Sequence, residues 1–199
     1  LNNAVFTGSE KKNHKHYKTV RTFNGNDSEE GFINVHVAMV SQTGELLQQQ
    51  QTCLESISKD DRKKFNENLQ GHYKIMNSIV QTLQTMWSAS LYKDYLTFRT
   101  FIMGQIGNNI CYPSEELVYD MGYSMEKHSY RGETGAQDSI VPSVDSFLQL
   151  EYPRNELTEY LFDLRKYRPK DHQAYINFVK NWSETLKMKE YCLKDTYSS

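Results

Sequence analysis

The sequence lacks any apolar run close to the ~18 residues that a membrane-spanning helix requires, so no segment is expected to cross a bilayer. It also lacks an excess of one charge, because 23 basic residues are set against 25 acidic ones and the formal net charge is -2. Binding to nucleic acid or to an anionic lipid surface by charge requires a basic excess. We therefore expect a chain that binds neither nucleic acid nor a membrane.

Cysteine and proline are also scarce. The three cysteines, Cys53, Cys111 and Cys192, are widely spaced and form no CxxC pair, which disfavours a disulfide framework and a zinc site. Free thiols are typical of a reducing compartment, so a cytoplasmic location is expected. Only four prolines and ten glycines interrupt the 199 residues, whereas there are 14 tyrosines and nine phenylalanines. This composition favours long elements packed through large side chains.

Helical periodicity dominates the first half of the chain. Between residues 32 and 57 the apolar positions recur at spacings of three and four, which predicts one helix of about seven turns. Asp27 with Glu30 forms a capping box that would start this helix. A second box, Ser58 with Asp61, precedes another periodic stretch. We expect the two helices to pack as an antiparallel pair.

The remaining pattern predicts further helices and few strands. Helices are expected over residues 91 to 102, 139 to 150, 155 to 167 and 171 to about 189, with a short extended segment at 117 to 119. The predicted fold class is therefore all-α, a helical bundle. Residues 1 to 20 are interpreted as an irregular polar segment, and residues 21 to 199 as a single all-α domain.

The glycine-rich stretch Arg131-Gly132-Glu133-Thr134-Gly135 lies just before the helix predicted from residue 139. Backbone N–H groups and the positive end of a helix dipole would converge there and could cradle an anion. A phosphate, a carboxylate or a haem propionate would each suit such a place. The same residues also fit an ordinary loop with a helix cap, and the spacing alone does not decide between these readings.

Two polar residues lie on apolar helix faces. Arg99 shares a face with Tyr95 and Ile102, and a guanidinium removed from water needs an anionic partner. That partner is either an acidic side chain of the protein or the carboxylate of a ligand. His36 lies on the apolar face of the first long helix, and it is either a hydrogen-bonded core histidine or a functional one.

Four motifs, in order along the chain, resemble the indoleamine 2,3-dioxygenases, haem enzymes that open the indole ring of tryptophan with dioxygen. They are the turn at residues 22 to 32, the helix segment Arg99-Thr100-Phe101-Ile102-Met103-Gly104, the glycine-rich stretch and the helix end at residues 162 to 169. The resemblance covers most of residues 17 to 190. It implies the fold of that family's large domain, haem b as cofactor, and tryptophan or another indoleamine with dioxygen as substrates. The product would be N-formylkynurenine.

The resemblance also implies roles for single residues. His36 and Arg99 would be the catalytic residues, His36 on the distal side of the haem and Arg99 on the substrate carboxylate. Phe32 and Tyr95 would line the substrate pocket. Asp94 departs from the family's pattern, in which an aromatic residue is usual at that position, and this leaves the shape of the pocket open.

On the cofactor side, Thr134 and Gly135 would approach a haem propionate, and Asp145 would help to hold the proximal side. The segment that carries the family's proximal histidine is not matched, so the iron ligand stays unassigned. We therefore expect either a part of a longer or split haem dioxygenase, or a relative that lost its iron ligand. Such a relative would serve as a structural or interaction subunit beside other chains of an assembly.

Overall fold

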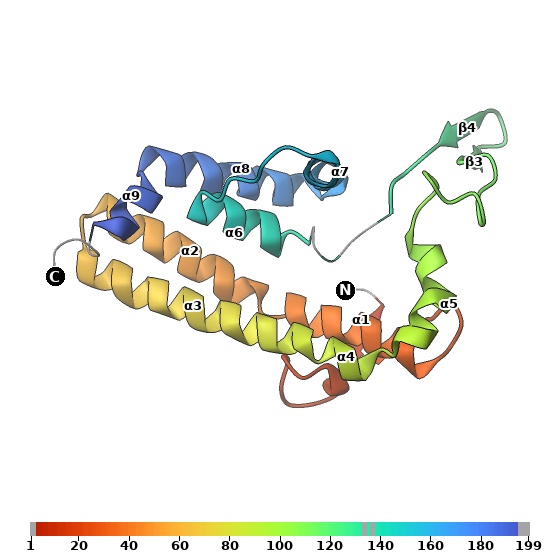
Figure 1. The fold of residues 1–199 in the computed structure, drawn as a ribbon, viewed down its shortest axis with the longest axis horizontal. Coiled ribbons are helices and arrows are strands. Elements are labelled where there is room, and N and C mark those ends of the chain that lie inside the picture. Colours follow the sequence, from red (N-terminus) through yellow and green to blue (C-terminus); the bar gives the residue numbers. More distant parts are fainter. Residues whose placement is uncertain (1–2, 133–134, 136–137, 195–199) are drawn as a thin grey trace. The chain divides into compact units, whose positions relative to one another are not determined.

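The computed structural model describes residues 3–132, 135 and 138–194, and this part is mostly helical (Figure 1). Its strands form two short antiparallel ribbons. Because helices make up most of this part of the chain, the predicted all-α class is confirmed. The chain divides into two compact units, Leu1–Ala38 with Thr82–Gly135, and Met39–Gln81 with Ala136–Ser199. None of the described helices has the length and apolar character that crossing a membrane requires.

The first unit contains most of one long helix, two shorter helices and both ribbons. The helices are α1 (Asp27–Val40), α4 (Met86–Ala89) and α5 (Tyr92–Ile102). The ribbons pair β1 (Ala4–Phe6) with β2 (Tyr17–Thr19), and β3 (Leu117–Asp120) with β4 (Met125–His128). The extended segment expected at residues 117 to 119 thus forms one strand of a hairpin.

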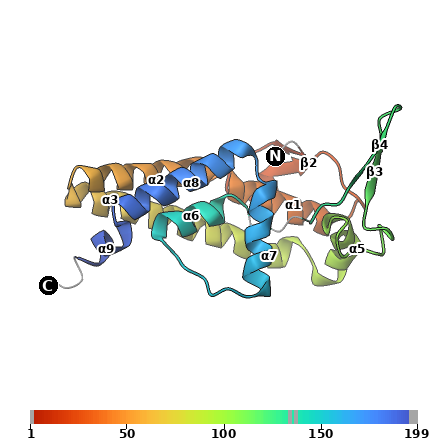
Figure 2. The ribbon, with the colours of Figure 1, turned by 90° about the horizontal axis from the view of Figure 1, so that it is seen from above.

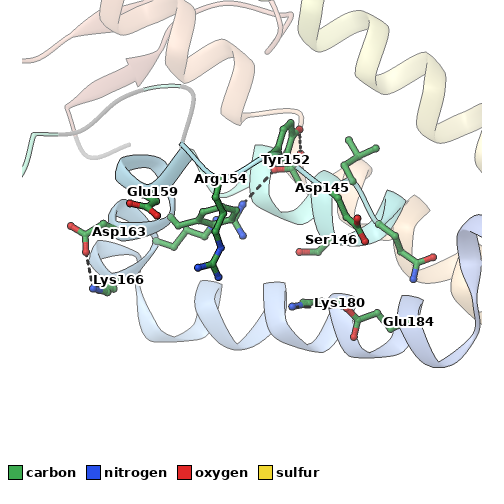
Figure 3. Close-up of a pocket in the computed structure, with 14 residues that line it drawn as sticks. Asp145, Ser146, Tyr152, Arg154, Glu159, Asp163, Lys166, Lys180 and Glu184 are labelled. Atoms are coloured by element: carbon green, nitrogen blue, oxygen red, sulfur yellow. Dashed lines mark hydrogen bonds and ion pairs between the residues drawn. The ribbon is translucent and has the colours of Figure 1, made fainter. Parts of the chain in front are cut away.

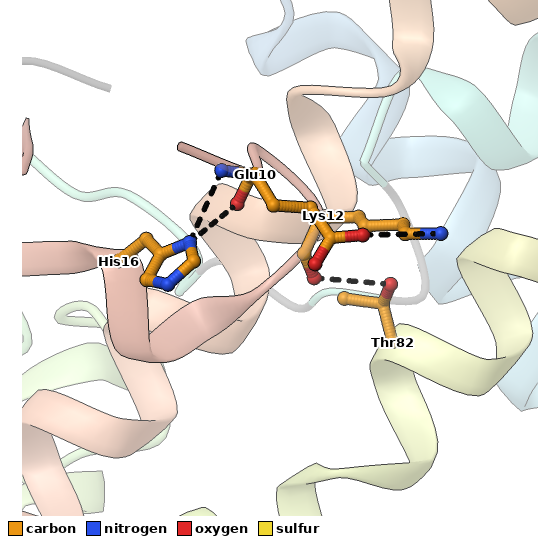
Figure 4. Close-up of polar contacts among 4 residues, drawn as sticks. All are labelled: Glu10, Lys12, His16 and Thr82. Atoms are coloured by element: carbon orange, nitrogen blue, oxygen red, sulfur yellow. Dashed lines mark hydrogen bonds and ion pairs between the residues drawn. The ribbon is translucent and has the colours of Figure 1, made fainter. Parts of the chain in front are cut away.

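The expectation of an irregular segment over residues 1 to 20 did not include the first ribbon, which pairs Phe6 with Tyr17. Hydrogen bonds fix the position of the basic stretch between its strands (Figure 4). The Lys12 carbonyl accepts a hydrogen bond from Thr82 Oγ1 at 3.5 Å, and His16 Nδ1 lies 3.1 Å from backbone atoms of Glu10. These hydrogen bonds pair backbone groups that an irregular segment would otherwise leave without a partner in the protein.

The helix predicted from residue 32 to 57 is broken after Val40, and α2 begins only at Thr43 and runs Thr43–Ser58. At the break Thr43 Oγ1 donates to the Val40 carbonyl at 2.6 Å. That carbonyl would have been used by the main chain in a continuous helix, so the hydroxyl competes with helix propagation. Apolar periodicity carries no information about this competition.

The predicted capping boxes are shifted. The cap of α1 is Asn26, one residue earlier than expected, because its Oδ1 accepts the N–H of Glu29 at 2.7 Å. The cap of α3 (Arg62–Gln84) is Asp61 rather than Ser58, and its Oδ1 accepts the N–H of Lys64 at 3.0 Å. Both side chains satisfy a backbone donor that the first helical turn leaves free.

In the second unit α2 and α3 form the predicted antiparallel pair. Asn68 on α3 donates to the Thr52 carbonyl and to Ser56 Oγ on α2, at 3.4 and 3.2 Å. The two helices share an apolar core with residues of three later helices. This core is formed by Cys53, Leu54, Ile57, Phe65, Phe147, Val179, Met188 and Tyr191.

The rest of the second unit consists of α6 (Ile140–Leu148), α7 (Glu156–Leu164), α8 (Lys170–Thr185) and α9 (Met188–Leu193). Helix α6 lies along α8, and α7 runs across them (Figure 1 and Figure 2). The helix expected to reach about residue 189 ends at Thr185, because Lys187 adopts a left-handed backbone with φ 52° that interrupts it.

Candidate functional site

An aromatic cluster joins α1 to α5. The ring of Phe32 lies 4.6 Å from that of His36 on its own helix, and 5.5 and 5.6 Å from those of Tyr95 and Phe98 on α5. Three of these residues were predicted site residues, and the structure brings them together. Phe98, which is fully buried, was missed. Its spacing of three from Tyr95 was the signal that could have found it.

The imidazole of His36 has a defined orientation. Its Nδ1 lies 2.8 Å from the carbonyl oxygen of Phe32, one turn earlier in α1. A carbonyl oxygen only accepts, so Nδ1 must carry the hydrogen. In the neutral ring Nε2 therefore holds a lone pair and acts as a hydrogen-bond acceptor.

Gly135 lies against the free edge of the His36 ring. A Cβ atom at position 135 would stand only 2.5 Å from His36 Nε2 and 3.1 Å from Cδ2. The structure thus brings the end of the glycine-rich stretch to the predicted distal histidine. Thr134, the other residue predicted to approach a propionate, lies outside the described residues.

The segment that leads to Gly135 is fastened to the end of α5. Gly104 and Arg131 form an isolated antiparallel bridge, and the Gln105 N–H donates to the Tyr130 carbonyl at 2.9 Å. Gln105 Oε1 in turn accepts the Tyr130 N–H at 3.0 Å. The residues just after α5 are therefore held to the start of the glycine-rich stretch by backbone contacts and one side-chain hydrogen bond.

Arg99 lies one turn after Tyr95 on α5 and is half-buried. Across the part of the chain that the structure describes, its guanidinium makes no hydrogen bond or ion pair. The alternative that an acidic side chain neutralises it is therefore not observed among those residues. An arginine in this position is able to take a carboxylate from a ligand.

Asp94, the position at which the sequence departs from the resemblance described above, has a local structural role. Ser28 Oγ donates to Asp94 Oδ2 at 2.7 Å, and the same hydroxyl accepts the Leu91 N–H at 3.1 Å. Ser28 lies in the first turn of α1, and Asp94 in that of α5. A polar link thus joins the starts of the two helices that carry the aromatic cluster.

Asp145, the predicted proximal residue, lies in the second unit on α6 and is only 9% exposed. Its Oδ1 accepts the Tyr152 hydroxyl at 2.9 Å, and Arg165 Nη2 lies 3.5 Å from its Oδ2 (Figure 3). Burial raises the pKa of Asp145, whereas the Tyr152 hydrogen bond and the Arg165 charge oppose that rise. The carboxylate is thus held in one orientation by a neutral donor and a cation.

This carboxylate lines an open groove of about 850 Å³ between α6, α7 and α8. The walls carry both charges, and Figure 3 shows Arg154, Glu159, Lys180 and Glu184 around the opening. Lys180 approaches Glu184 at 3.9 Å on the same helix. Because the walls carry both charges, they favour neither an anionic nor a cationic ligand.

The described residues contain no group of three or more His, Cys, Asp or Glu side chains placed to hold a metal ion. Three other histidines of the first unit contact their own neighbours: His14 approaches Thr85 at 3.2 Å, His16 approaches Glu10, and His128 approaches Glu126 at 3.3 Å. The proximal iron ligand therefore stays unassigned.

His72 in the second unit was interpreted as a packing residue, and its ring does pack against Phe147 at 4.9 Å. It is 4% exposed, and its Nε2 has no hydrogen-bond partner in the described part of the chain. Desolvation lowers the pKa of His72 to about 4. The side chain lines an apolar groove of about 590 Å³ between α3 and α6.

Aromatic rings, one oriented imidazole and an arginine thus lie on two helices, α1 and α5, of a mostly helical chain. The sequence profile of indoleamine 2,3-dioxygenase matches residues 2–198, and the chain belongs to that family. It is 28% identical over 177 residues to indoleamine 2,3-dioxygenase 2 of Homo sapiens, covering 81% of this chain and 39% of that protein. The protein of the same name from Mus musculus is 28% identical over 163 residues, with 80% and 38% covered. The chain thus spans about two fifths of the length of these curated relatives.

Proposed function

We propose that this chain forms the distal side of a haem-dependent dioxygenase site, where tryptophan or another indoleamine reacts with dioxygen to give N-formylkynurenine. Family membership supports the reaction class. The observation that carries the proposal is the meeting of Phe32, His36 and Tyr95 in one cluster, with Arg99 one turn further along α5. The three free cysteines agree with the reducing, cytoplasmic location that we also propose.

The residues present fit the distal side of haem b. Phe32 and His36 offer an apolar ring and one imidazole, and Gly135 keeps a side chain away from that imidazole. Asp145, which Tyr152 and Arg165 hold in the second unit, would be a carboxylate able to hydrogen-bond a metal-bound histidine, as buried carboxylates do. Haem, when bound, supplies the dioxygen-activating redox chemistry that side chains lack.

Arg99 would bind the substrate carboxylate. Its guanidinium has no acidic partner among the described residues, so binding an anion would not require breaking an existing ion pair. Tyr95 precedes it by one turn and contacts Phe32, so the aromatic wall begins beside the charge. A ligand with an indole and a carboxylate matches this order of apolar and cationic groups.

His36 would accept the indole N–H through Nε2. Its other nitrogen is occupied by the Phe32 carbonyl at 2.8 Å, so Nε2 is the acceptor of the neutral ring. The same lone pair is able to hold the indole proton during ring opening. Orientation of this atom by a bond within the helix lowers the entropy cost of positioning the substrate.

The test uses the full chain mixed with haemin. We expect the Soret band to shift and sharpen relative to haemin alone, and to change again when tryptophan is added. A chain whose circular dichroism shows folded helices but which leaves the haemin Soret band unchanged would contradict the proposal. That outcome would favour the alternative of a structural or interaction subunit.

A further inference from the structure

We propose that Gly135 is a specificity-determining residue, because its missing side chain is what allows a histidine at position 36. This inference rests on the proposed function, and it concerns which hydrogen-bonding group the pocket offers to a ligand. The two residues come from distant parts of the sequence and meet within the first unit.

The space at position 135 carries the first step. A Cβ atom there would lie 2.5 Å from His36 Nε2, 3.1 Å from Cδ2 and 3.8 Å from Cε1. Favourable contacts between such atoms begin at about 3.5 Å. Lack of space beside the His36 ring is therefore enough to exclude a larger residue at position 135 while that ring keeps its place.

The second step concerns whether His36 could move aside. Its Nδ1–H bond to the Phe32 carbonyl and its ring contact with Phe32 hold the imidazole on α1. Phe32 is in turn held by Tyr95 and Phe98, both on α5. Any side chain at position 135 would therefore break the Nδ1–H bond or disturb the aromatic cluster, and overpacking of that kind is destabilising.

It follows that positions 36 and 135 form a size-matched pair. Histidine with Gly135 gives the pocket an imidazole nitrogen that accepts in the neutral ring. A serine at position 36 would leave room for a methyl group at position 135, and its hydroxyl would both donate and accept. The pair therefore decides whether the ligand meets an imidazole or a hydroxyl.

The experiment is a double-mutant cycle on the full chain with Gly135→Ala, His36→Ser and the two combined. The control is Gly44→Ala, because a Cβ at position 44 meets no atom within 4 Å. We expect Gly135→Ala to lower Tm by about 5 °C and to shift the ¹⁵N signals of the His36 ring. His36→Ser should restore most of the lost Tm in the double variant. Gly44→Ala should leave the His36 signals unchanged.

Two results would overturn the proposal: additive effects of the two substitutions on Tm, or unchanged His36 signals in Gly135→Ala. If Gly135→Ala does not fold, the double variant decides, because it should fold if His36 is the obstacle and stay unfolded if it is not. A haemin titration of the wild-type chain is read separately. A Soret band unchanged from that of haemin alone would count against the proposed function, whereas the cycle alone decides on the pair.

Discussion

His36 donates its Nδ1 hydrogen to the carbonyl oxygen of Phe32, one turn earlier in α1, across 2.8 Å. The sequence left open whether His36 is a hydrogen-bonded core residue or a functional one. The structure shows the hydrogen bond, because Nδ1 is bound within the helix while Nε2 faces Gly135, and the functional role stays a prediction. An anchored ring whose second nitrogen has no partner among the described residues suits a positioned acceptor.

This bond predicts the tautomer of His36 in solution. At a pH where the ring is neutral, we expect the hydrogen on Nδ1 and none on Nε2, because the Phe32 carbonyl cannot donate. Long-range ¹H–¹⁵N spectra of the full chain distinguish the two tautomers. Observation of a protonated Nε2 in the neutral ring would show that the helix bond does not hold in solution.

Replacing Arg99 by alanine should weaken tryptophan binding to the haem-bound chain by about 10- to 100-fold, the loss expected for a hydrogen bond to a charged group. The Soret band should change little. Lys93→Ala, an exposed cation on the same helix, serves as the control and should leave affinity unchanged. Calorimetric titration gives both affinities. Equal binding by wild type and Arg99→Ala would remove Arg99 from the site.

Replacing Tyr152 by phenylalanine should lower the free energy of unfolding at neutral pH by about 1 to 2 kcal/mol, because Asp145 loses the hydroxyl at 2.9 Å. The pKa of Asp145, already raised by burial, should rise further. The difference from wild type should shrink as pH falls through that pKa, since a protonated carboxyl needs the donor less. Urea unfolding across pH measures this. Tyr73→Phe, at a residue that is 65% exposed, is the control and should have no such effect.

Acidification should destabilise the second unit through His72. Its pKa is lowered to about 4 in the folded chain, below the ordinary value of 6.5, so the unfolded chain binds the proton more readily. Stability is therefore unaffected above pH 6.5 and is lost as pH falls from 6.5 towards 4. The full loss is about 3 kcal/mol by linkage.

The check on His72 compares the wild type with His72→Phe, by urea unfolding at several pH values. A change of packing alters the free energy of unfolding of the variant by the same amount at every pH. Only the slope of that free energy against pH therefore reports the titration of His72. We expect the wild type to lose stability more steeply than the variant between pH 6.5 and 4. Parallel curves would mean that His72 titrates as it does in the unfolded chain.

Local pattern determined much of the fold. Apolar spacings of three and four predicted the helical class and the antiparallel pairing of α2 with α3. A helix must bury one face, and the spacing of its apolar residues shows which face that is. The end of α2 shows the limit of such reasoning. Ser58 was assigned as the cap of the next helix, but Asp61 has the side chain that reaches the free N–H of Lys64.

The sequence also singled out Phe32, His36, Tyr95 and Arg99, since polar or aromatic residues on apolar faces and the family motifs are visible without coordinates. Spacing does not encode where a loop returns to a helix. Only the tertiary structure brought Gly135 within reach of His36 Nε2, and only it showed Asp94 bonded to Ser28. Both contacts depend on the path of the chain between distant residues, and that path is set by packing of the whole unit rather than by any local pattern.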